Sequence, residues 1–507
     1  MRSLSLFVVL FLALGLAACA GGSPTAQVPA SATVAPLPTA ATAAPTAAAP
    51  TPVATVAVTV AARTVPPTAT PVPTQVSPPG QKIGQGVADA AAVDAIDISG
   101  QPVEVIFWHI FTANQEQGLK DIIAAFEAQY PNIKVRPVYK GMYDVTRKAT
   151  LTGIAADLVP DMVWSFPYTV SEYAREDVVQ PLDPFMQSDK YGLGVPSVAA
   201  TGSLSANIDA ALLDAYKYRD FAGQTLSLPP GVSADVMYYN ADWLKQLGYD
   251  RPPATYDQFM EVCAKVKAAT PDKWCAALLP DASRFVSFVF SRGGDILTAD
   301  NQPAFREQGL ATLRWYRELF DQGYAYQPGQ QFGDQADFGL GKTLFAFGTS
   351  TGVPFYHRVV TDPATNKERF AWSFAPYPRT TARPVVNVFG PSAAILKTTP
   401  ERSLAAWQFL KFWLSPEASA TWGSQSNYYP VNRAARDTAT MQAYLKDNPV
   451  YAQGFDLFQY ARSEPTVPGW QAARGGVANG LVAVMTNKAT PAEAIDMMVT
   501  ATTEALK

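Results

Sequence analysis

From residue 103 the chain alternates short apolar runs with stretches whose apolar side chains recur three or four positions apart. The apolar runs at 103–108, 133–139 and 162–164 predict strands, and the helical spacing at 115–130 and 143–156 predicts helices between them. Strands that alternate with helices in this way form the parallel sheet of an α/β fold.

The ends of these predicted strands carry aromatic and polar residues. Ligands of open parallel sheets bind beyond the carboxyl ends of the strands, which here lead into loops at 109–112, 140–143 and 165–168. His109 would face a cleft from the end of the first strand, or would hydrogen-bond to backbone instead. Trp164 and Tyr168 are candidates to stack on a ligand, and core packing is the alternative for Trp164.

The amino terminus has the pattern of an exported lipoprotein. Arg2 precedes an apolar run from Leu4 to Leu16, and Leu16-Ala17-Ala18-Cys19 follows in the manner of a lipobox. We therefore expect a signal peptide over residues 1–18, cleavage before Cys19 and a lipid on Cys19. The run is too short to span a bilayer, so acyl chains would supply the anchor; the alternative is an ordinary signal peptide with an incidental cysteine.

A segment rich in Pro, Ala and Thr follows. From Ala20 to about Gln85 the chain has only Arg63 and Lys82 as charges and no aromatic side chain with which to build a core. Repeated proline favours extended polyproline-like structure over helix or sheet. We expect residues 19–100 to be a disordered tether between the membrane and a globular domain.

The globular part, residues 102–507, is long enough for more than one lobe. Single cores stop growing at about 250–300 residues, so a chain of this length should divide into at least two compact units. The formal net charge is −4 and no basic run is present, which argues against nucleic acid as a partner. Cys263 and Cys275 remain as an even pair; on the oxidising side of a membrane they could form a disulfide, or could stay as small core residues.

An enzyme would need chemistry that the sequence does not single out. The only histidines, His109 and His357, have no metal-ligand spacing and no serine elbow nearby. A lipid-anchored carbohydrate-active hydrolase stays open as the alternative, because a pair of carboxylates among 43 acidic residues cannot be excluded from sequence. We expect no catalytic residue, no cofactor and no metal.

Several segments together are similar to one known family. Residues 107–135 resemble its first strand and helix, and 228–262 resemble its crossover strand with Tyr-Tyr-Asn and the following helix start. Residues 339–352, 388–422 and 487–506 resemble, in order, its Gly-Lys turn, its return to the first lobe and its closing helix. The chain is thus identified as a member of the family 1 extracellular solute-binding proteins, the maltose-binding type that serves ABC importers.

The resemblance implies an α/β fold of two lobes joined by hinge strands, with the ligand in the cleft between them. The first lobe would comprise about 102–234 and 387–431, and the second about 235–386 and 432–507. Hinge closure around a carbohydrate or related polyol would deliver it to the transmembrane subunits of an ABC permease. The receptor would act as a monomer on the extracytoplasmic face of the bacterial membrane.

Within the family the chain looks most like the branch that contains glycerol-3-phosphate-binding proteins. Five positions fall where that branch places ligand-contacting residues: Tyr143, Ser233, Ser350, Gly390 and Tyr428. Two positions depart from it. Pro167 stands where the branch has a pocket carboxylate, and Thr466 stands where it has a phosphate-holding arginine.

The departure at Thr466 puts glycerol phosphate in doubt, because phosphate recognition normally uses a bidentate guanidinium or a nest of backbone N–H groups. Arg474, eight positions on, could compensate or could be a solvated surface residue. Arg284, with Asp281 and Ser283, is a candidate hydroxyl partner. Trp470 in a polar loop is a candidate aromatic platform.

Overall fold

The computed structural model describes residues 80–195, 204–208, 210–330 and 332–507. The predicted signal peptide, Cys19 and the predicted tether as far as residue 79 lie outside the described residues. All described residues belong to one compact unit that spans residues 75–507.

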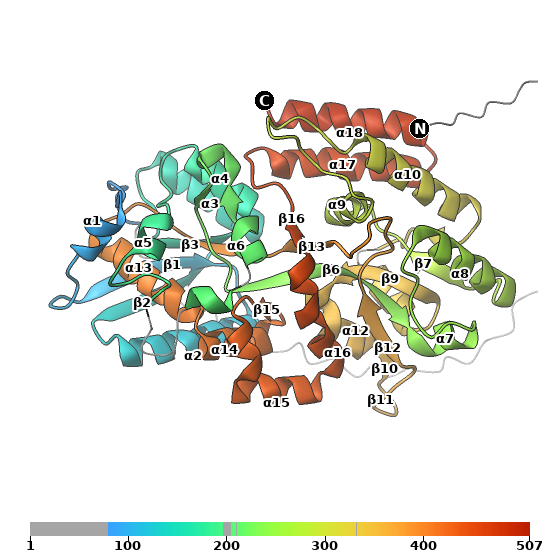
Figure 1. The fold of residues 1–507 in the computed structure, drawn as a ribbon, viewed down its shortest axis with the longest axis horizontal. Helices are drawn as coiled ribbons and strands as arrows, with labels where there is room; N and C mark the ends of the chain where they lie inside the picture. Colours follow the sequence, from blue (N-terminus) through green and yellow to red (C-terminus); the bar gives the residue numbers. More distant parts are fainter. Residues whose placement is uncertain (1–79, 196–203, 209, 331) are drawn as a thin grey trace, which may run out of the picture. The chain divides into compact units, whose positions relative to one another are not determined.

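A first, four-stranded sheet has the order β14-β3-β1-β2 (Figure 1). Its strands are β1 (Val103–His109), β2 (Ile133–Tyr139), β3 (Met162–Ser165) and β14 (Ser392–Ile395). β1 is parallel to β2 and β3, which confirms the predicted parallel arrangement, while β14 returns antiparallel to β3.

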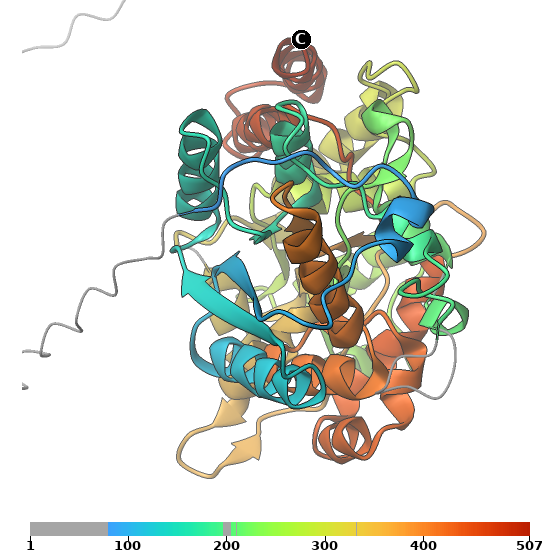
Figure 2. The same ribbon diagram turned by 90° about the vertical axis from the view of Figure 1, so that its left-hand side faces the viewer.

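Helices flank the first sheet, and the two predicted ones begin and end within two residues of their predicted bounds. The helices are α2 (Ala113–Gln129), α3 (Tyr143–Ala155), α4 (Pro167–Ala174), α13 (Pro400–Trp413) and α14 (Pro416–Ser426). In Figure 2, which faces this end of the unit, α13 crosses in front of the ribbon and α2 lies below it.

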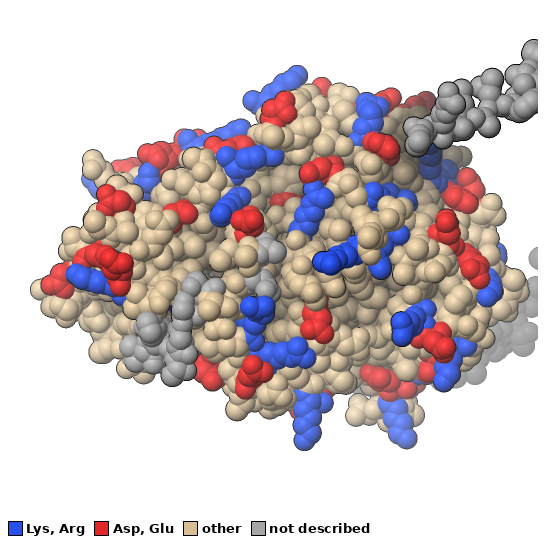
Figure 3. Space-filling model, viewed as in Figure 1, with Lys and Arg blue, Asp and Glu red and all other residues tan. Residues whose placement is uncertain are grey.

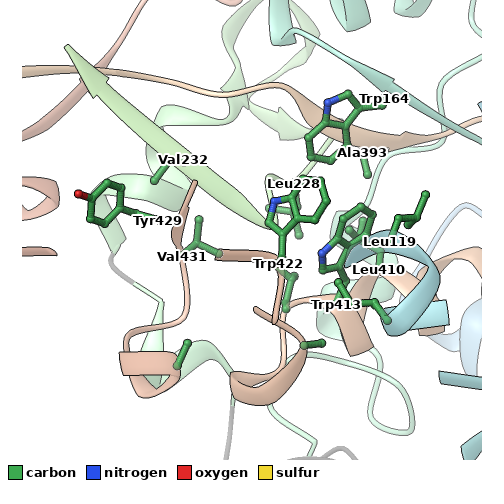
Figure 4. Packing of buried hydrophobic residues seen from close by; sticks show 14 of the residues in the cluster. Leu119, Trp164, Leu228, Val232, Ala393, Leu410, Trp413, Trp422, Tyr429 and Val431 are labelled. Carbon is green, nitrogen blue, oxygen red and sulfur yellow. The ribbon is translucent and has the colours of Figure 1, made fainter. Parts of the chain in front are cut away.

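Tryptophan rings fill the space between the first sheet and these helices (Figure 4). Trp413 stacks on Trp164 at 5.6 Å between ring centroids and meets Trp422 edge-on at 5.0 Å. All three side chains are at most 1% exposed, so this cluster is the centre of the first lobe's core.

A second sheet of eight strands forms the other part of the unit. Six strands follow the order β16-β13-β6-β9-β7-β8, and β12 and β15 pair separately with β6. The strands are β6 (Gly231–Asn240), β7 (Trp274–Ala277), β8 (Ala325–Tyr326), β9 (Thr343–Thr349), β12 (Trp372–Ala375), β13 (Val386–Phe389), β15 (Tyr429–Pro430) and β16 (Ala461–Ser463).

Helices that pack on this second sheet bury a separate core. The buried cluster runs from Met237 to Met498 and is rich in Phe, Trp and Tyr. The helices are α7 (Ala241–Gln246), α8 (Tyr256–Ala269), α9 (Ala282–Ser291), α10 (Arg306–Asp321), α17 (Trp470–Met485) and α18 (Pro491–Ala505). Two further helices, α11 (Gly333–Gly339) and α12 (Val353–Val360), bury their apolar side chains in the cluster that also contains the tryptophans of the first lobe. Two separate sheets match the expectation of more than one lobe.

Short elements complete the described chain. They are α1 (Ala90–Asp94), α5 (Asp183–Gln187), η1 (Leu204–Asn207), α6 (Ala210–Ala215), β4 (Lys217–Tyr218), η2 (Arg219–Phe221), β5 (Gln224–Thr225), η3 (Ser350–Gly352), β10 (Thr361–Asp362), β11 (Lys367–Glu368), η4 (Arg433–Asp437), α15 (Ala439–Asp447), α16 (Pro449–Ala452) and η5 (Gln453–Tyr460).

The chain passes between the two sheets through β6 and again between β13 and β14, close to the predicted crossings at 234/235 and 386/387. The predicted crossing at 431/432 is not where the packing changes. η4 and α15 pack against α14 of the first lobe, and Met441 of α15 is buried in the same cluster as Trp422. The remaining lobe bounds stay a prediction.

The predicted tether extends too far towards the carboxyl end. Residues 80–99 are docked on the first lobe, because Val87, Val93 and Ile98 are buried there. The side chain of Gln180 accepts a hydrogen bond from the Val87 amide and donates one to the Val87 carbonyl, at 2.7 and 3.0 Å. Three apolar residues are too few to make the composition of residues 80–99 differ from that of the tether. The sequence therefore does not separate the docked segment from the tether.

Cys263 of α8 and Cys275 of β7 form a disulfide, which was one of the two alternatives for this pair. Their Cα atoms are 5.0 Å apart, and both side chains are at most 1% exposed.

Removal of this disulfide is expected to destabilise the second lobe. A crosslink that closes a loop of this size contributes about 2–4 kcal/mol, mainly by restricting the unfolded chain. The double variant Cys263→Ala/Cys275→Ala should therefore show a lower free energy of unfolding in urea than the wild type. The wild type measured in reductant should approach the variant; an unchanged urea midpoint in both would contradict the prediction.

Charged side chains of both signs are interspersed over the face in Figure 3. No helix in the described part of the chain combines the length and the apolar character that a membrane span requires.

Candidate functional site

A cavity of about 210 Å³ lies between the loop that follows β3 of the first sheet and several segments of the second sheet. Its lining residues are Phe166, Pro167, Tyr168, Ala215, Tyr216, Asp235, Asp281, Ser283, Arg284, Gly348, Thr349, Val388, Phe389, Gly390, Ser463, Glu464, Pro465, Thr466 and Arg474. Both lobes therefore contribute residues to one cavity.

The first lobe supplies an aromatic wall. Pro167 opens α4 directly after β3 and holds the loop in an extended turn, which places Phe166 and Tyr168 side by side. Their rings stack at 5.3 Å with an angle of 13° between their planes. Stacked aromatic faces of this kind suit the apolar side of a small ring-shaped solute.

The amino-terminal turn of α9 supplies charged and polar groups. The Asp281 side chain caps this helix by accepting a hydrogen bond from the Arg284 amide at 3.0 Å. The Arg284 guanidinium lies 3.4 Å from Asp334, which is 1% exposed. Arg284 is thus held by the buried Asp334 carboxylate at the edge of the cavity.

Asp235 of β6 lies beside this turn and is 3% exposed. Its Oδ2 accepts hydrogen bonds from Ser287 at 2.7 Å and from Tyr377 at 3.1 Å. Burial, reinforced by the neighbouring Asp281 charge, raises the pKa of Asp235 to about 7. This carboxyl therefore exchanges its proton near neutral pH.

The segment after β16 brings a second ion pair to the cavity. Glu464 pairs with Arg474 of α17, and its Oε2 also accepts a hydrogen bond from the Trp470 indole at 2.8 Å. Arg474 donates to the Ser283 hydroxyl at 2.9 Å, which links α17 to α9. Burial opposes ionisation of Arg474, but the Glu464 charge prevails and raises the pKa of the guanidinium.

Three of the predicted ligand-contacting residues line the cavity: Tyr168, Arg284 and Gly390. The Gly390 carbonyl accepts a hydrogen bond from Tyr216 at 3.0 Å. A Cβ at residue 390 would lie 3.0 Å from the carbonyl oxygen of Gly231, so the close approach of two strands favours glycine there.

Four other predicted residues adjoin the cavity. Tyr143 packs on Phe166 at 4.4 Å, and burial, reinforced by the neighbouring Tyr428, raises the pKa of Tyr143 well above its ordinary value. Ser233 and Ser350 face each other with hydroxyl oxygens 3.4 Å apart, beside the lining residue Thr349. Ligand contact by these four residues stays a prediction.

The last three predicted residues are core residues in this structure. His109 is 3% exposed, its Nδ1 accepts a hydrogen bond from the Phe111 amide at 3.1 Å, and burial lowers its pKa to about 4. Trp164 belongs to the tryptophan cluster of the first lobe. Trp470 is 0% exposed and positions Glu464 instead of facing the cavity.

The cavity also contains residues that sequence reasoning did not select. Asp235 lies two positions after Ser233 on the same face of β6, so the strand period could have indicated it. Glu464 had no such signal, because its place depends on packing against α17. The two positions that depart from the glycerol-3-phosphate branch, Pro167 and Thr466, both line the cavity.

A polar contact joins the lobes at the side of the cavity. The Asn301 amide donates to both oxygens of Asp220 at 3.0 Å, and Arg219 donates to the Thr298 carbonyl at 2.9 Å. Arg219 and Asp220 precede Phe221, which packs with the first sheet, whereas Leu297 belongs to the core of the second. We call the four hydrogen-bonded residues, Arg219, Asp220, Thr298 and Asn301, the lobe contact.

Within the described ranges, no group of three or more His, Cys, Asp or Glu side chains is arranged to hold a metal ion. The groups that line the cavity offer hydrogen bonding by carboxylates and guanidinium groups, together with aromatic stacking.

Known proteins are similar to this chain over most of its globular part. The family model for bacterial extracellular solute-binding proteins matches residues 121–449. A putative binding protein of Brucella abortus is 24% identical over 394 residues, which cover 75% of this chain and 88% of that protein.

Two solved structures show the same fold. The sugar-binding protein MalE of Xanthomonas citri matches with a TM-score of 0.68 at 20% identity, over 80% of this chain and 97% of its own. UgpB of Mycobacterium tuberculosis, solved in complex with glycerophosphocholine, matches with a TM-score of 0.62 at 21% identity, over 80% and 98%. These likenesses confirm the two-lobed α/β architecture predicted for the chain.

Proposed function

The chain belongs to the bacterial extracellular solute-binding proteins, and we propose that it captures a small carbohydrate or related polyol by hinge closure and delivers it to an ABC permease. The observation that carries the proposal is the cavity between the lobes, with an aromatic wall on one side and carboxylate and guanidinium groups on the other. Groups from both lobes can contact one solute only when the lobes are closed.

The size of the cavity favours a small solute. About 210 Å³ is below the range of about 300–1,000 Å³ that drug-sized ligands occupy, so a single ring or a short polyol fits better than a long oligosaccharide. Glycerophosphocholine and sugars, which related proteins bind, are the first solutes to test.

The anchor belongs to the same proposal. A lipid on Cys19 and the tether would keep the receptor close to its permease on the extracytoplasmic face while the lobes open and close. Replacement of Cys19 by serine should then release a receptor that still binds solute. We further propose that the receptor acts as a monomer.

A thermal-shift screen of the full chain in detergent tests the receptor function. Monosaccharides, disaccharides, glycerol-3-phosphate and glycerophosphocholine are the probes, because a solute that binds only the folded state raises the melting temperature. At least one should raise it in a saturable manner, and none should be chemically changed afterwards. Turnover of a chromogenic glycoside without any saturable shift would contradict the proposal.

The lobe contact is expected to slow solute release. Asp220→Ala removes both acceptors of Asn301 at an exposed position, so the expected loss is about 0.5–1 kcal/mol, or roughly two- to fivefold in affinity. Stopped-flow release of the best solute should be faster by that factor. Asp250→Ala, at an exposed site away from the lobe contact, is the control; equal release rates in all three proteins would refute the prediction.

A further inference from the structure

Acidic groups outnumber basic groups around the cavity. Three carboxylates, those of Asp235, Asp281 and Glu464, line it together with only two guanidinium groups, those of Arg284 and Arg474. Asp334 adds a fourth carboxylate directly behind Arg284. Since a buried charge is costly unless it is paired, this arrangement lacks positive charge when all four acids are ionised.

Two of these carboxylates have one oxygen that accepts no hydrogen bond from a described residue. Asp235 accepts both of its hydrogen bonds on Oδ2, and no described residue donates to its Oδ1. Glu464 repeats the pattern: Oε2 takes Trp470 and Arg474, while Oε1 is buried and without a donor in the described chain. At 3% and 7% exposure, both side chains reach little solvent that could replace a donor.

Hydrogen bonds place these two carboxylates on one wall. Ser287 donates to Asp235 and to the Ser283 carbonyl, and the Ser283 hydroxyl accepts from Arg474, the partner of Glu464. The aromatic pair Phe166 and Tyr168 belongs to the same cavity. Aromatic faces near anionic oxygens are the groups that recognise organic cations.

We propose that the solute is a polyol that carries a positively charged ammonium group, which binds Oδ1 of Asp235 beside the negative charge of Glu464. The inference rests on the proposed function, because it assigns the solute class of the same cavity. Burial raises the pKa of Asp235 and of Asp334, as expected for acids that lack a full set of positive partners. A bound ammonium group would supply such a partner.

Two matched pairs of probes test the proposal on the full chain in detergent. Glucosamine against glucose adds an amine to a neutral ring, and glycerophosphocholine against glycerol-3-phosphate adds a quaternary ammonium group. Titration calorimetry should give, in at least one pair, an affinity about tenfold or more higher for the cationic member, as charge-assisted contacts require. The pair that shows it distinguishes an amino sugar from a choline ester.

Asp235→Asn keeps the shape of the side chain and removes its charge. In this variant the ratio of affinities within the responding pair should fall below about threefold, because the ammonium group loses an anionic partner. Asp177→Asn, whose side chain is 94% exposed, is the matched control and should keep the wild-type ratio. If Asp235→Asn folds poorly, the same ratio of affinities is measured on Glu464→Gln, which removes the other carboxylate charge.

The outcomes separate this inference from the receptor function. If glucose or glycerol-3-phosphate binds as tightly as its cationic partner, the chain is a solute receptor but the ammonium proposal is wrong. If no probe of either pair binds, the ammonium proposal is wrong, because the carboxylates of the cavity then do not recognise an ammonium group. A wild-type preference that Asp235→Asn and Glu464→Gln both leave unchanged would also overturn it.

Discussion

Arg474→Met is expected to raise the dissociation constant for the solute by roughly tenfold or more. Arg474 pairs with Glu464 and donates to Ser283, so it holds one wall of the cavity together. Without Arg474 the buried Glu464 carboxylate is uncompensated and takes up a proton, so the solute loses a charge-assisted interaction, which is worth about 1.5–3 kcal/mol. Calorimetric titration with the best solute from the thermal-shift screen measures the change.

Controls separate binding from folding in this experiment. Arg306→Met removes an arginine whose ion pair with Asp496 is exposed, and it should leave solute affinity unchanged. Glu464→Gln/Arg474→Met removes both charges; it should recover most of the stability lost in Arg474→Met, while its affinity stays low. Wild-type affinity in Arg474→Met would show that the cavity does not bind the solute.

Trp413→Ala should lower the free energy of unfolding by about 3–5 kcal/mol, the usual cost of removing a fully buried aromatic side chain. Trp413 is 0% exposed and contacts both Trp164 and Trp422, whose rings also contact each other (Figure 4). Phe107 meets Trp413 edge-on at 6.0 Å. Loss of the indole leaves a void that the surrounding rings cannot fill without leaving their rotamers. Urea unfolding followed by circular dichroism measures the change.

The matched control for this variant is Phe355→Ala. Its ring is 48% exposed, so the expected change is within about 0.5 kcal/mol of the wild type. Equal urea midpoints for Trp413→Ala and the wild type would mean that the tryptophan cluster is not the core of the first lobe.

The part of the fold that sequence predicts best is the part with the clearest local period. Residues 103–165 form strand, helix, strand, helix and strand as expected, because each element buries one regular set of apolar side chains. The docked segment 80–99 escaped prediction for the opposite reason. Its buried apolar side chains are Val87, Val93 and Ile98, and its other contacts are hydrogen bonds to residues far along the chain, such as those to Gln180.

The residues of the cavity are harder to predict from local sequence patterns than the strands and helices are. Tyr168, Arg284 and Gly390 could be selected from strand ends and resemblance, and they line the cavity. His109 sits at a strand end as well, but its ring turns into the core against Phe111, at a centroid distance of 5.3 Å. The direction of a side chain at the end of a strand depends on the helices packed around it, which no local pattern records.

Glu464 illustrates the second reason for a miss. It has no apolar period around it and no motif, and its role depends on Arg474 and Trp470 of a helix that follows it. A charged residue in a loop is most often solvated, so only the packing of α17 reveals that this one is buried.

Hydrogen–deuterium exchange of the full chain, with and without a saturating concentration of the best solute, tests the central claim most directly. Binding in the cavity between the lobes predicts slower amide exchange in the peptides that contain residues 166–168 and 463–466, because both lobes close on the solute. Unchanged exchange in both peptides, with protection confined to another surface such as that around residues 254–257 and 379–381, would contradict the account.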